Sequence, residues 1–263
     1  MNTGLKNRVA IVAASSSGLG RAVAEGLAEE GCHLALCSRS RERIEATAQA
    51  IAATHGVRVW ARELDVTKPP AVAEFVAAAA REFGRLDICV TNAGGPPAKP
   101  FASTTIEEWR LAVDLNLLSH VAFARSVLPI MQQAQWGRFL MISSVAVKQP
   151  IEGLVLSNTV RGAVPGLTRT LANEYGPYNI LVNNICPGYT RTDRLIELAK
   201  VKALAQGTAT EEAFEEWARN TALGRLAEPR EFADAVVFLA SERAAFITGQ
   251  NLLVDGGFYK GTL

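Results

Sequence analysis

Unbroken apolar runs of strand length recur along the chain and constrain its fold more than any other feature. They lie at residues 8–14, 33–38, 57–61, 86–91, 137–143, 180–185 and 251–255. A strand without alternating polar residues must be covered on both faces of its sheet, as happens in parallel sheets. The runs therefore predict about seven buried strands.

Segments with helical periodicity fill the intervals between these runs. The segments expected to be helical are 19–30, 41–54, 71–83, 106–133 and 155–175. Alternating strands and helices are joined by right-handed crossovers, which put helices on both faces of a parallel sheet. We expect an α/β fold with a doubly wound parallel sheet (Rossmann fold). The 263 residues show no repeat or composition break, so residues 1–263 should form a single domain.

Charge and cysteine usage exclude several classes of partner. Lys and Arg number 27 against 26 Asp and Glu, a formal charge of +1 that offers no field for nucleic acid. The sequence has no signal peptide and no run of about 18 apolar residues, so we expect no membrane partner and a cytoplasmic location. The single cysteines Cys32, Cys37, Cys89 and Cys186 lack metal-ligand spacing and are interpreted as reduced core thiols, with no metal site.

A glycine-rich turn follows the first expected strand. It reads A-A-S-S-S-G-L-G-R at residues 13–21 and opens a helix. Glycines allow close approach of the backbone, and the helix N-terminus directs free N–H groups at a pyrophosphate. The residues expected to contact a dinucleotide here are Ser15, Ser17, Gly18, Leu19 and Gly20.

Nearly the whole chain resembles the short-chain dehydrogenase/reductase family. Besides the glycines, the resemblance rests on L-D-V (64–66), T-N-A-G (91–94), Asn116 in W-R-L-A-V-D-L-N, I-S-S (142–144), P-G-Y-T-R-T (187–192) and T-G-Q-N-L-L-V-D-G-G (248–257). The family's first turn begins Thr-Gly, where this chain has Ala13 and Ala14. A Cβ at a glycine position is expected to strain the turn without abolishing nucleotide binding.

The residues at the end of the second strand predict which dinucleotide the protein binds. NAD-preferring members of the family carry Asp where this chain has Ser38, and Arg39 follows it. A guanidinium suits a 2′-phosphate, so we predict NADP(H) rather than NAD(H). The alternative is that Arg39 and Arg41 merely begin the next helix at the surface. Ser17 stands where many NADP-preferring members have a second cationic contact.

The resemblance also implies the remaining contacts to the cofactor. Asp65 and Val66 are expected beside the adenine. The floor beneath the adenosine ribose should be formed by Asn92, Ala93 and Gly94, and the nicotinamide end by Pro187, Gly188, Thr190 and Thr192. The alternatives are a helix N-cap role for Asp65 and a plain loop for Pro187 and Gly188.

In the family, a tyrosine donates the proton, a lysine four residues later assists it, and a serine and an asparagine complete the set. By resemblance, Asn116 and Ser144 match the last two. Counting back from G-L-T-R-T-L-A-N-E (166–174) puts Ser157 in the tyrosine place and Arg161 in the lysine place. Ser144 and Ser157 are 13 positions apart, the usual separation, and no tyrosine lies between Trp60 and Glu174.

Three hypotheses follow from these replacements. In the first, the protein is an NADP(H) oxidoreductase acting on a small-molecule carbonyl or alcohol, and a water held by Ser144, Ser157 and Asn116 and polarised by Arg161 delivers the proton. Lys148 and Tyr189 are alternative donors. In the second, the protein binds the nucleotide without turnover and acts as a sensor or oligomer partner. In the third, Arg161 clamps the carboxylate of an acidic substrate.

Residues 192–221 form a largely helical insertion after a predicted strand. Ligands of open α/β sheets lie beyond the carboxyl ends of the strands, so this insertion is expected to be a substrate lid, or else an ordinary surface helix pair. Resemblance to 3-oxoacyl-carrier-protein reductases suggests a 3-oxoacyl-type substrate. It also implies a homotetramer packed through helices 106–133 and 155–175 and the C-terminal segment.

Overall fold

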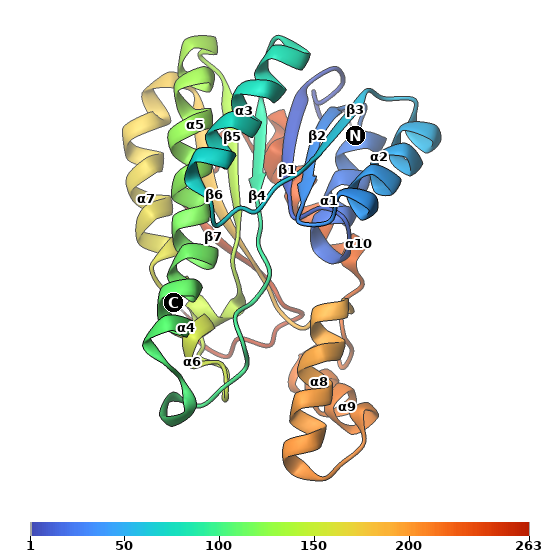
Figure 1. Cartoon of the computed structure of the whole chain (residues 1–263), viewed down its shortest axis with the longest axis vertical. Coiled ribbons are helices and arrows are strands. Elements are labelled where there is room, and N and C mark those ends of the chain that lie inside the picture. Colours follow the sequence, from blue (N-terminus) through green and yellow to red (C-terminus); the bar gives the residue numbers. More distant parts are fainter. Residues whose placement is uncertain (1, 263) are drawn as a thin grey trace.

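The computed structural model describes residues 2–262 as a seven-stranded parallel sheet flanked by helices (Figure 1). The strands are β1 (Val9–Ala13), β2 (His33–Ser38), β3 (Val59–Glu63), β4 (Ile88–Thr91), β5 (Gly137–Ile142), β6 (Ile180–Pro187) and β7 (Asn251–Val254). Their order across the sheet is β3-β2-β1-β4-β5-β6-β7, and every neighbouring pair is parallel. The fold class predicted from the apolar runs is confirmed.

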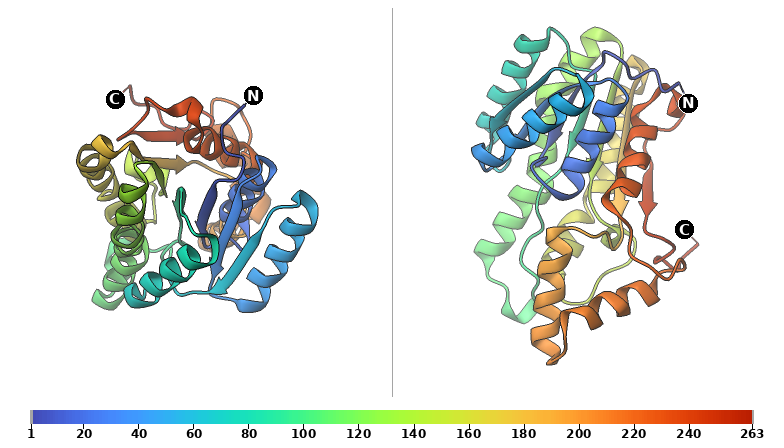
Figure 2. Two further views of the ribbon diagram at one scale, coloured as in Figure 1. Left: turned by 90° about the horizontal axis from the view of Figure 1, so that it is seen from above. Right: turned by 90° about the vertical axis from the view of Figure 1, so that its right-hand side faces the viewer.

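Helices cover both faces of this sheet (Figure 2). The long helices are α1 (Gly18–Glu29), α2 (Arg41–His55), α3 (Pro69–Phe83), α4 (Ile106–Val113), α5 (Ser119–Ala134), α6 (Val155–Arg161), α7 (Val164–Tyr175), α8 (Asp193–Gln206), α9 (Thr210–Asn220) and α10 (Pro229–Ala240). Buried residues of α1, α2 and α10 form one apolar cluster with the strands, and those of α3, α5 and α7 form another on the opposite face. Burial on both faces explains why most of the strands are unbroken apolar runs.

Short helices connect or interrupt these elements. They are η1 (Phe101–Ser103), η2 (Asp114–Leu118), η3 (Val145–Val147), η4 (Gly176–Tyr178) and η5 (Glu242–Ala244). The turn η2 is a π-helix within the continuous helix that runs from Ile106 to Ala134. By length and composition this helix could cross a membrane, which the sequence analysis did not anticipate. Half of its most apolar window is buried inside the fold, as in a core helix.

Two expected boundaries were wrong. The strand expected at 57–61 is β3, Val59–Glu63, an edge strand whose residues are half-buried or exposed, so apolar character does not mark its end. The single helix expected at 155–175 is two helices, because α6 ends at Arg161 and Pro165 lies in the first turn of α7. Inside a longer helix, Pro165 would lack the N–H for the Arg161 carbonyl and its ring would clash with it.

The four cysteines are buried and unpaired, as predicted for core thiols. Burial raises the pKa of Cys32 and of Cys37 to about 12. Burial also raises the pKa of Cys89 and, against weaker opposing hydrogen bonds, that of Cys186. All four are therefore neutral thiols at physiological pH.

The sheet has a topological switch point between β1 and β4, which are neighbours although the strand order reverses there. Ligands of doubly wound sheets bind outside the carboxyl ends of the strands at this point. Helices α8 and α9 project beyond the same end (Figure 1). The fold therefore directs attention to the loops that follow β1, β4, β5 and β6.

Candidate functional site

The turn between β1 and α1 is shaped by two glycines. A Cβ on Gly20 would lie 2.3 Å from the carbonyl oxygen of Ala14, which is far inside contact distance. Gly18 adopts a φ of +55°, in the region that favours glycine. The N-cap residue Ser17 makes no side-chain cap to α1, so N–H groups of the first turn remain available to a ligand. A phosphate is the group that such a terminus binds best.

Two of the predicted contacts in this turn face inward. The Ser15 side chain is fully buried, and its hydroxyl donates to the Val12 carbonyl at 2.9 Å. Leu19 is half-buried and packs against the core cluster beneath α1. Their side chains stabilise the turn itself, which leaves Ser17, Gly18 and Gly20 as its ligand-facing positions.

Ala14 has the left-handed conformation expected of a glycine, with a φ of +50°. We expect Ala14→Gly to raise the free energy of unfolding in urea by about 1 kcal/mol, because a left-handed conformation costs a residue with a Cβ roughly that much. The control is Ala13→Gly in β1, which should lower stability by about 0.5–1 kcal/mol through added chain entropy. Destabilisation by both substitutions would show that Ala14 is not strained.

The ends of β2 and β3 bring together the residues predicted at the adenosine. The buried Ser38 hydroxyl donates to the Ser40 carbonyl at 3.0 Å, while the Arg39 side chain is exposed. Burial raises the pKa of Asp65, but hydrogen bonds from Thr67 and the charges of Lys68 and Arg39 outweigh this effect and lower it. Asp65 is therefore an anion within the field of Arg39.

Asp65 also has a structural role in its own turn. Its Oδ1 accepts from the Thr67 amide at 3.0 Å and from the Thr67 hydroxyl at 2.8 Å. Val66 is buried beneath it. The alternative of a helix N-cap role is wrong, because α3 begins at Pro69 with Lys68 as its N-cap, and Asp65 stabilises the turn before that helix.

The loop after β4 forms the floor of the site. The Gly94 carbonyl accepts from Asn116 Nδ2 at 2.9 Å and lies 3.5 Å from Arg161 Nη2. Asn92 reaches toward the glycine-rich turn, since its Nδ2 lies 3.0 Å from where a Cβ of Gly20 would be. Ala93 between them is buried. The floor thus connects the nucleotide turn to Asn116 and Arg161.

The loop after β6 closes the opposite side. Gly188 packs tightly on Asp255, whose Cα would be 2.7 Å from a Cβ at this position. Thr190 is buried, and its hydroxyl lies 3.5 Å from the carbonyl of Gly188. Thr192 caps α8 by accepting from the Leu195 amide at 3.3 Å. Pro187, the last residue of β6, is half-buried.

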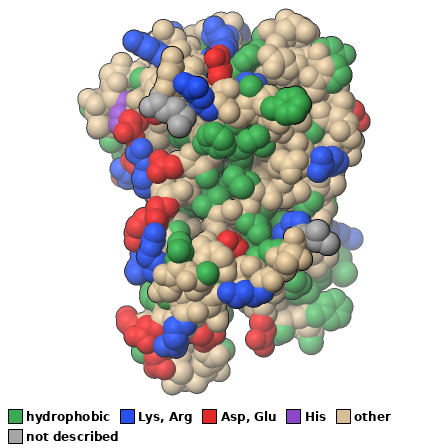
Figure 3. Space-filling model, turned by 180° about the vertical axis from the view of Figure 1, so that it is seen from behind, with side chains coloured by type: hydrophobic (Ala, Val, Ile, Leu, Met, Phe, Trp, Pro, Cys, Tyr) green, Lys and Arg blue, Asp and Glu red, His purple; other side chains and the backbone are tan. Residues whose placement is uncertain are grey.

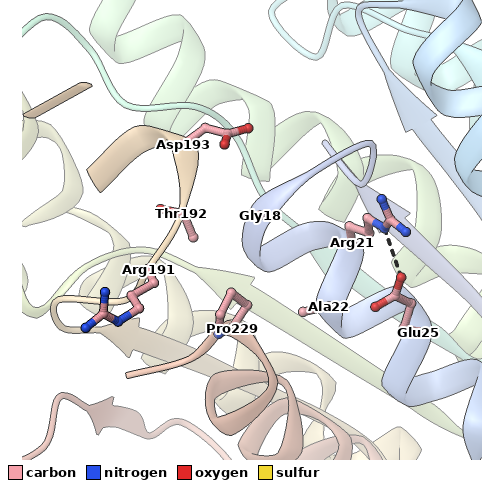
Figure 4. A pocket seen from close by; sticks show the side chains of 8 residues that line it. All are labelled: Gly18, Arg21, Ala22, Glu25, Arg191, Thr192, Asp193 and Pro229. Atoms are coloured by element: carbon pink, nitrogen blue, oxygen red, sulfur yellow. Dashed lines mark hydrogen bonds and ion pairs between the residues drawn. The ribbon is translucent and has the colours of Figure 1, made fainter. Parts of the chain in front are cut away.

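A cleft of about 250 Å³ separates the start of α1 from the start of α8. Figure 4 shows Gly18 and Thr192 on its two sides, with Arg21 and Glu25 paired along α1 at 2.9 Å. A Cβ on Gly18 would lie 3.5 Å from Thr192 Cγ2. The turn predicted to hold the pyrophosphate and the loop predicted at the nicotinamide end therefore face each other.

The four residues predicted at the reaction centre lie on elements that pack together. Ser144 follows β5 and caps η3, where its hydroxyl accepts from the Ala146 amide at 3.1 Å. Asn116 lies in η2, and α6 packs against both η2 and η3. Ser157 and Arg161 are both buried on α6, four residues apart, so they share its inner face.

Ser157 has a hydroxyl without a hydrogen-bond partner among residues 2–262, although only 8% of the residue is exposed. The neighbouring Asn158 fixes this part of α6, since its side chain accepts from the Ile151 amide at 3.2 Å and donates to the Ile151 carbonyl at 2.8 Å. The Ser157 hydroxyl is therefore positioned by the helix and remains available to a ligand or water.

Arg161 extends from α6 to the carboxyl end of β5. Its Nη1 donates to the Ser143 carbonyl at 2.9 Å and lies 3.4 Å from the Ile142 carbonyl. Burial and the charge of Arg194 lower the pKa of Arg161 to about 10, so the guanidinium stays charged at neutral pH. Neutral main-chain carbonyls are its only hydrogen-bond partners within residues 2–262.

Behind Arg161, α5 contributes a histidine that the sequence analysis missed. His120 is buried, its Nδ1 lies 2.6 Å from the Thr91 hydroxyl, and its Nε2 has no partner. Asn116 Oδ1, one turn earlier, is also buried without a partner in the described chain. The i, i+4 spacing to Asn116 on an expected helix was the available signal.

His120 makes stability pH-dependent. Burial and the charge of Arg161 lower its pKa from 6.5 to about 3. The unfolded chain therefore binds a proton below pH 6.5 that the folded protein does not, and stability falls as the pH drops toward 3, by about 1.4 kcal/mol per unit. When the free energy of unfolding in urea is measured between pH 6.5 and 4.5, its slope against pH should be shallower in His120→Gln than in the wild type by about this amount. Equal slopes in the wild type and in His120→Gln would contradict the prediction.

The two alternative donors lie in unfavourable positions for proton transfer. The Lys148 side chain is exposed beyond η3. Tyr189 stacks on Trp217 at a ring distance of 5.0 Å and meets Phe258 edge-on. Burial and the charge of Glu216 raise the pKa of Tyr189 to about 12, which makes its phenol a weaker acid than usual.

Fold and site together define a class, the dinucleotide-binding α/β proteins with a polar centre at the carboxyl ends of β4 and β5. Comparison with known proteins gives the family. The family described as "Enoyl-(Acyl carrier protein) reductase" matches residues 13–259. The chain belongs to the short-chain dehydrogenase/reductase family.

Relatives of known name span nearly the whole chain. The short-chain reductase protein NovJ of Streptomyces niveus is 36% identical over 95% of this chain and 93% of its own length. The 3-oxoacyl-[acyl-carrier-protein] reductase FabG of Aquifex aeolicus is 32% identical over 98% of this chain and 100% of its own. The crystal structure of L-sorbose reductase from Gluconobacter frateurii with NADPH and L-sorbose has a TM-score of 0.94 and 33% identity, covering 99% and 100% of the two chains.

Proposed function

We propose that the protein is an NADP(H)-dependent oxidoreductase that reduces a small-molecule carbonyl, or oxidises the corresponding alcohol, without a tyrosine as proton donor. The observation that carries the proposal is that Asn116 and Arg161 both reach the Gly94 carbonyl, while α6, which carries Ser157, packs against η2 and against η3, which Ser144 caps. A protein that only binds a nucleotide has no chemical need for this centre. Relatives named as 3-oxoacyl reductases make a 3-oxoacyl-type carbonyl the first candidate.

The residues present fit the cofactor. A Cβ at Gly20 would fill the space where the backbone must turn, and the N-terminus of α1 offers N–H groups for the pyrophosphate. Arg39 offers a guanidinium for the 2′-phosphate. When bound, the nicotinamide supplies the hydride chemistry. Structures similar to this one, the L-sorbose reductase and the actinorhodin polyketide ketoreductase variant, were solved with NADPH.

Replacement of Arg39 tests the choice of nucleotide. We expect Arg39→Ser to raise the Kd for NADPH about 10- to 100-fold, because a hydrogen bond to a charged phosphate is lost. The Kd for NADH should stay within about threefold, since that nucleotide has no such phosphate. Fluorescence titration measures both, and the control is Arg41→Ser, whose exposed side chain pairs with Glu45. Equal NADPH and NADH affinities in the wild type would refute the NADP(H) assignment.

The proton follows a different route from that of the family. Ser157 takes the tyrosine place and Arg161 the lysine place, so no phenol is available. An aliphatic hydroxyl is too weak an acid to replace it, and arginine does not release its proton. A water held by Ser144, Ser157 and Asn116 delivers the proton to the carbonyl oxygen, and the hydroxide that remains takes up a proton from solvent. Arg161 polarises that water and stabilises the developing alkoxide.

The experiment is a turnover assay with a panel of ketones, 3-oxoacyl thioesters and 2-oxo acids. Oxidation of bound NADPH by at least one carbonyl class supports the proposal. Binding of NADPH with no oxidation across the panel would instead favour a silent nucleotide-binding protein. Ser157→Tyr combined with Arg161→Lys should increase carbonyl reduction, because the pair restores a phenol and a point charge one helical turn apart. No increase would indicate a rebuilt pocket.

A lid role for residues 192–221 belongs to the same proposal. Helices α8 and α9 pack on each other around Leu195, Ala199, Ala213 and Trp217, a small apolar cluster separate from the two sheet clusters. This pair begins at Thr192, beside the nucleotide cleft. A unit with its own core that borders the crevice can close over a substrate as a body.

We also propose a homotetramer. Large apolar side chains are exposed on two of the three segments that the family resemblance implicates, namely Ile106, Leu111 and Leu118 on the α4–α5 helix and Phe238, Phe246 and Leu252 in the C-terminal part. Figure 3 shows hydrophobic side chains gathered over the middle of the face seen from behind. Contiguous exposed apolar surface is typical of interfaces. Light scattering that gave the mass of one chain would refute it.

A further inference from the structure

Two arginines from different elements converge on the loop after β4. Arg161 of α6 reaches the Gly94 carbonyl, at 3.5 Å from Nη2. Arg194, in the first turn of α8, donates from Nη2 to the Pro96 carbonyl at 2.5 Å. A Cβ on Gly95, between those two residues, would lie 2.9 Å from Arg194 Nε. The two guanidinium groups therefore flank a stretch of three residues.

The positive charge of this pair is balanced only in part among residues 2–262, because Arg194 has one carboxylate partner and Arg161 has none. Arg161 is 6% exposed and has no carboxylate within 4.0 Å among residues 2–262. Arg194 has only Glu197, at 3.4 Å on the outer side of α8, and both of these side chains are partly exposed. A buried charge without a counter-ion is costly, and three carbonyl dipoles compensate it only in part.

The neighbouring titratable groups add no negative charge. Burial keeps the Cys186 thiol neutral by raising its pKa, and it keeps His120 neutral by lowering its pKa to about 3. The charge of Arg194 contributes to the lowered pKa of Arg161, and the two guanidinium groups donate to carbonyls only two residues apart, those of Gly94 and Pro96. Neither group therefore supplies a negative charge to balance the Arg161 guanidinium.

We infer that the substrate is a 2-oxo acid, with a carboxylate beside its reacting carbonyl, in place of the uncharged 3-oxoacyl thioester considered first, and that Arg161 and Arg194 bind this carboxylate together. The inference rests on the proposed function, since it names the substrate class of the same site. A guanidinium fork matches a carboxylate in a bidentate arrangement, and one anion between two arginines would balance the buried charge.

Position argues that this anion belongs to the substrate and not to the cofactor. The cofactor phosphates are expected at the N-terminus of α1 and at Arg39, whereas Arg161 lies against the carbonyls of Ile142 and Ser143, at the carboxyl end of β5. Arg194 belongs to the helix pair proposed as a lid. A carboxylate bound to both arginines would connect that pair to the floor of the site.

Titration of the NADPH-loaded protein with malonate, and with the neutral malonamide as comparison, tests this inference. By calorimetry we expect malonate to bind at least about tenfold more tightly than malonamide, because it forms charge-assisted hydrogen bonds. Arg194→Gln and Arg161→Met should each weaken malonate about 10- to 100-fold. The control is Arg219→Gln, which removes an equal charge from the exposed side of α9 and should leave malonate binding unchanged. Arg194 is partly exposed, so its variant should fold even if the Arg161 variant does not.

Equal binding of malonate and malonamide would overturn the inference, and so would unchanged malonate binding in Arg194→Gln. If Arg194→Gln weakened NADPH tenfold and left malonate unchanged, Arg194 would serve the cofactor phosphates, which also overturns it. Failure of the proposed function looks different: malonate binds as expected, but no carbonyl oxidises NADPH. Turnover of methyl pyruvate faster than pyruvate would contradict the substrate class alone.

Discussion

Gly20→Ala is expected to destabilise the protein by about 3 kcal/mol and to abolish measurable NADPH binding, because the new Cβ overpacks the turn. The added atom would lie 2.3 Å from the Ala14 carbonyl oxygen and 2.9 Å from its carbon, and both of these are backbone atoms. Backbone cannot move aside as a flexible side chain can. The turn would have to open, and the first residues of α1 would lose their position relative to Asn92.

Gly166→Ala is the matched control for that variant. Gly166 lies in α7, and a Cβ there would meet no atom within 4 Å. This substitution should stabilise the protein by up to about 1 kcal/mol, because alanine has a higher helix propensity than glycine. Urea unfolding and NADPH titration measure both variants. Wild-type stability and NADPH affinity in Gly20→Ala would contradict the close approach that the turn requires.

The sheet was predictable because its strands are buried on two faces. That condition forces unbroken apolar runs, and it holds for β1, β2, β4, β5 and β6. It fails for β3, where an edge position removes the requirement, and the predicted boundaries were accordingly wrong. The apolar pattern alone predicted one helix where the structure has α6 and α7, because the apolar spacing continues through Pro165. A regular α-helix cannot continue through a proline in the same way.

Some features of the candidate site could likewise be predicted from the sequence, and others could not. Resemblance and i, i+4 spacing grouped Ser157 with Arg161, and the strain expected at Ala14 is confirmed by its φ of +50°. The convergence of Arg194 on Gly95 and Pro96 was not predictable, because these residues are about a hundred positions apart and meet only through the folded sheet. His120 was missed because its spacing of four residues from Asn116 does not show that both side chains lie buried beside Arg161, which depends on the packing of α5 against the sheet.

Arg161→Met is expected to lower kcat/KM about 10²- to 10³-fold with the best carbonyl substrate, as is typical when one electrostatic group is removed from a reaction centre. The charge of Arg161 is held among main-chain carbonyls, and methionine at this position would leave no positive charge on α6 beside the floor of the site. Arg161→Lys keeps a point charge and should retain more activity than Arg161→Met. Higher activity in Arg161→Lys than in Arg161→Met would show that the lost charge, and not the changed shape of the side chain, lowers kcat/KM.

Arg138→Met separates catalysis from stability in this experiment. Arg138 is as buried as Arg161, and burial likewise lowers its pKa to about 10, but it lies at the start of β5, at the opposite end of the sheet. Its guanidinium stacks on Trp136 and donates to the Gly137 carbonyl at 2.9 Å. Both methionine variants should lose stability in urea, while only Arg161→Met should lose kcat/KM. Equal kinetic losses in the two would mean that Arg161 acts through the fold and has no part in the chemistry.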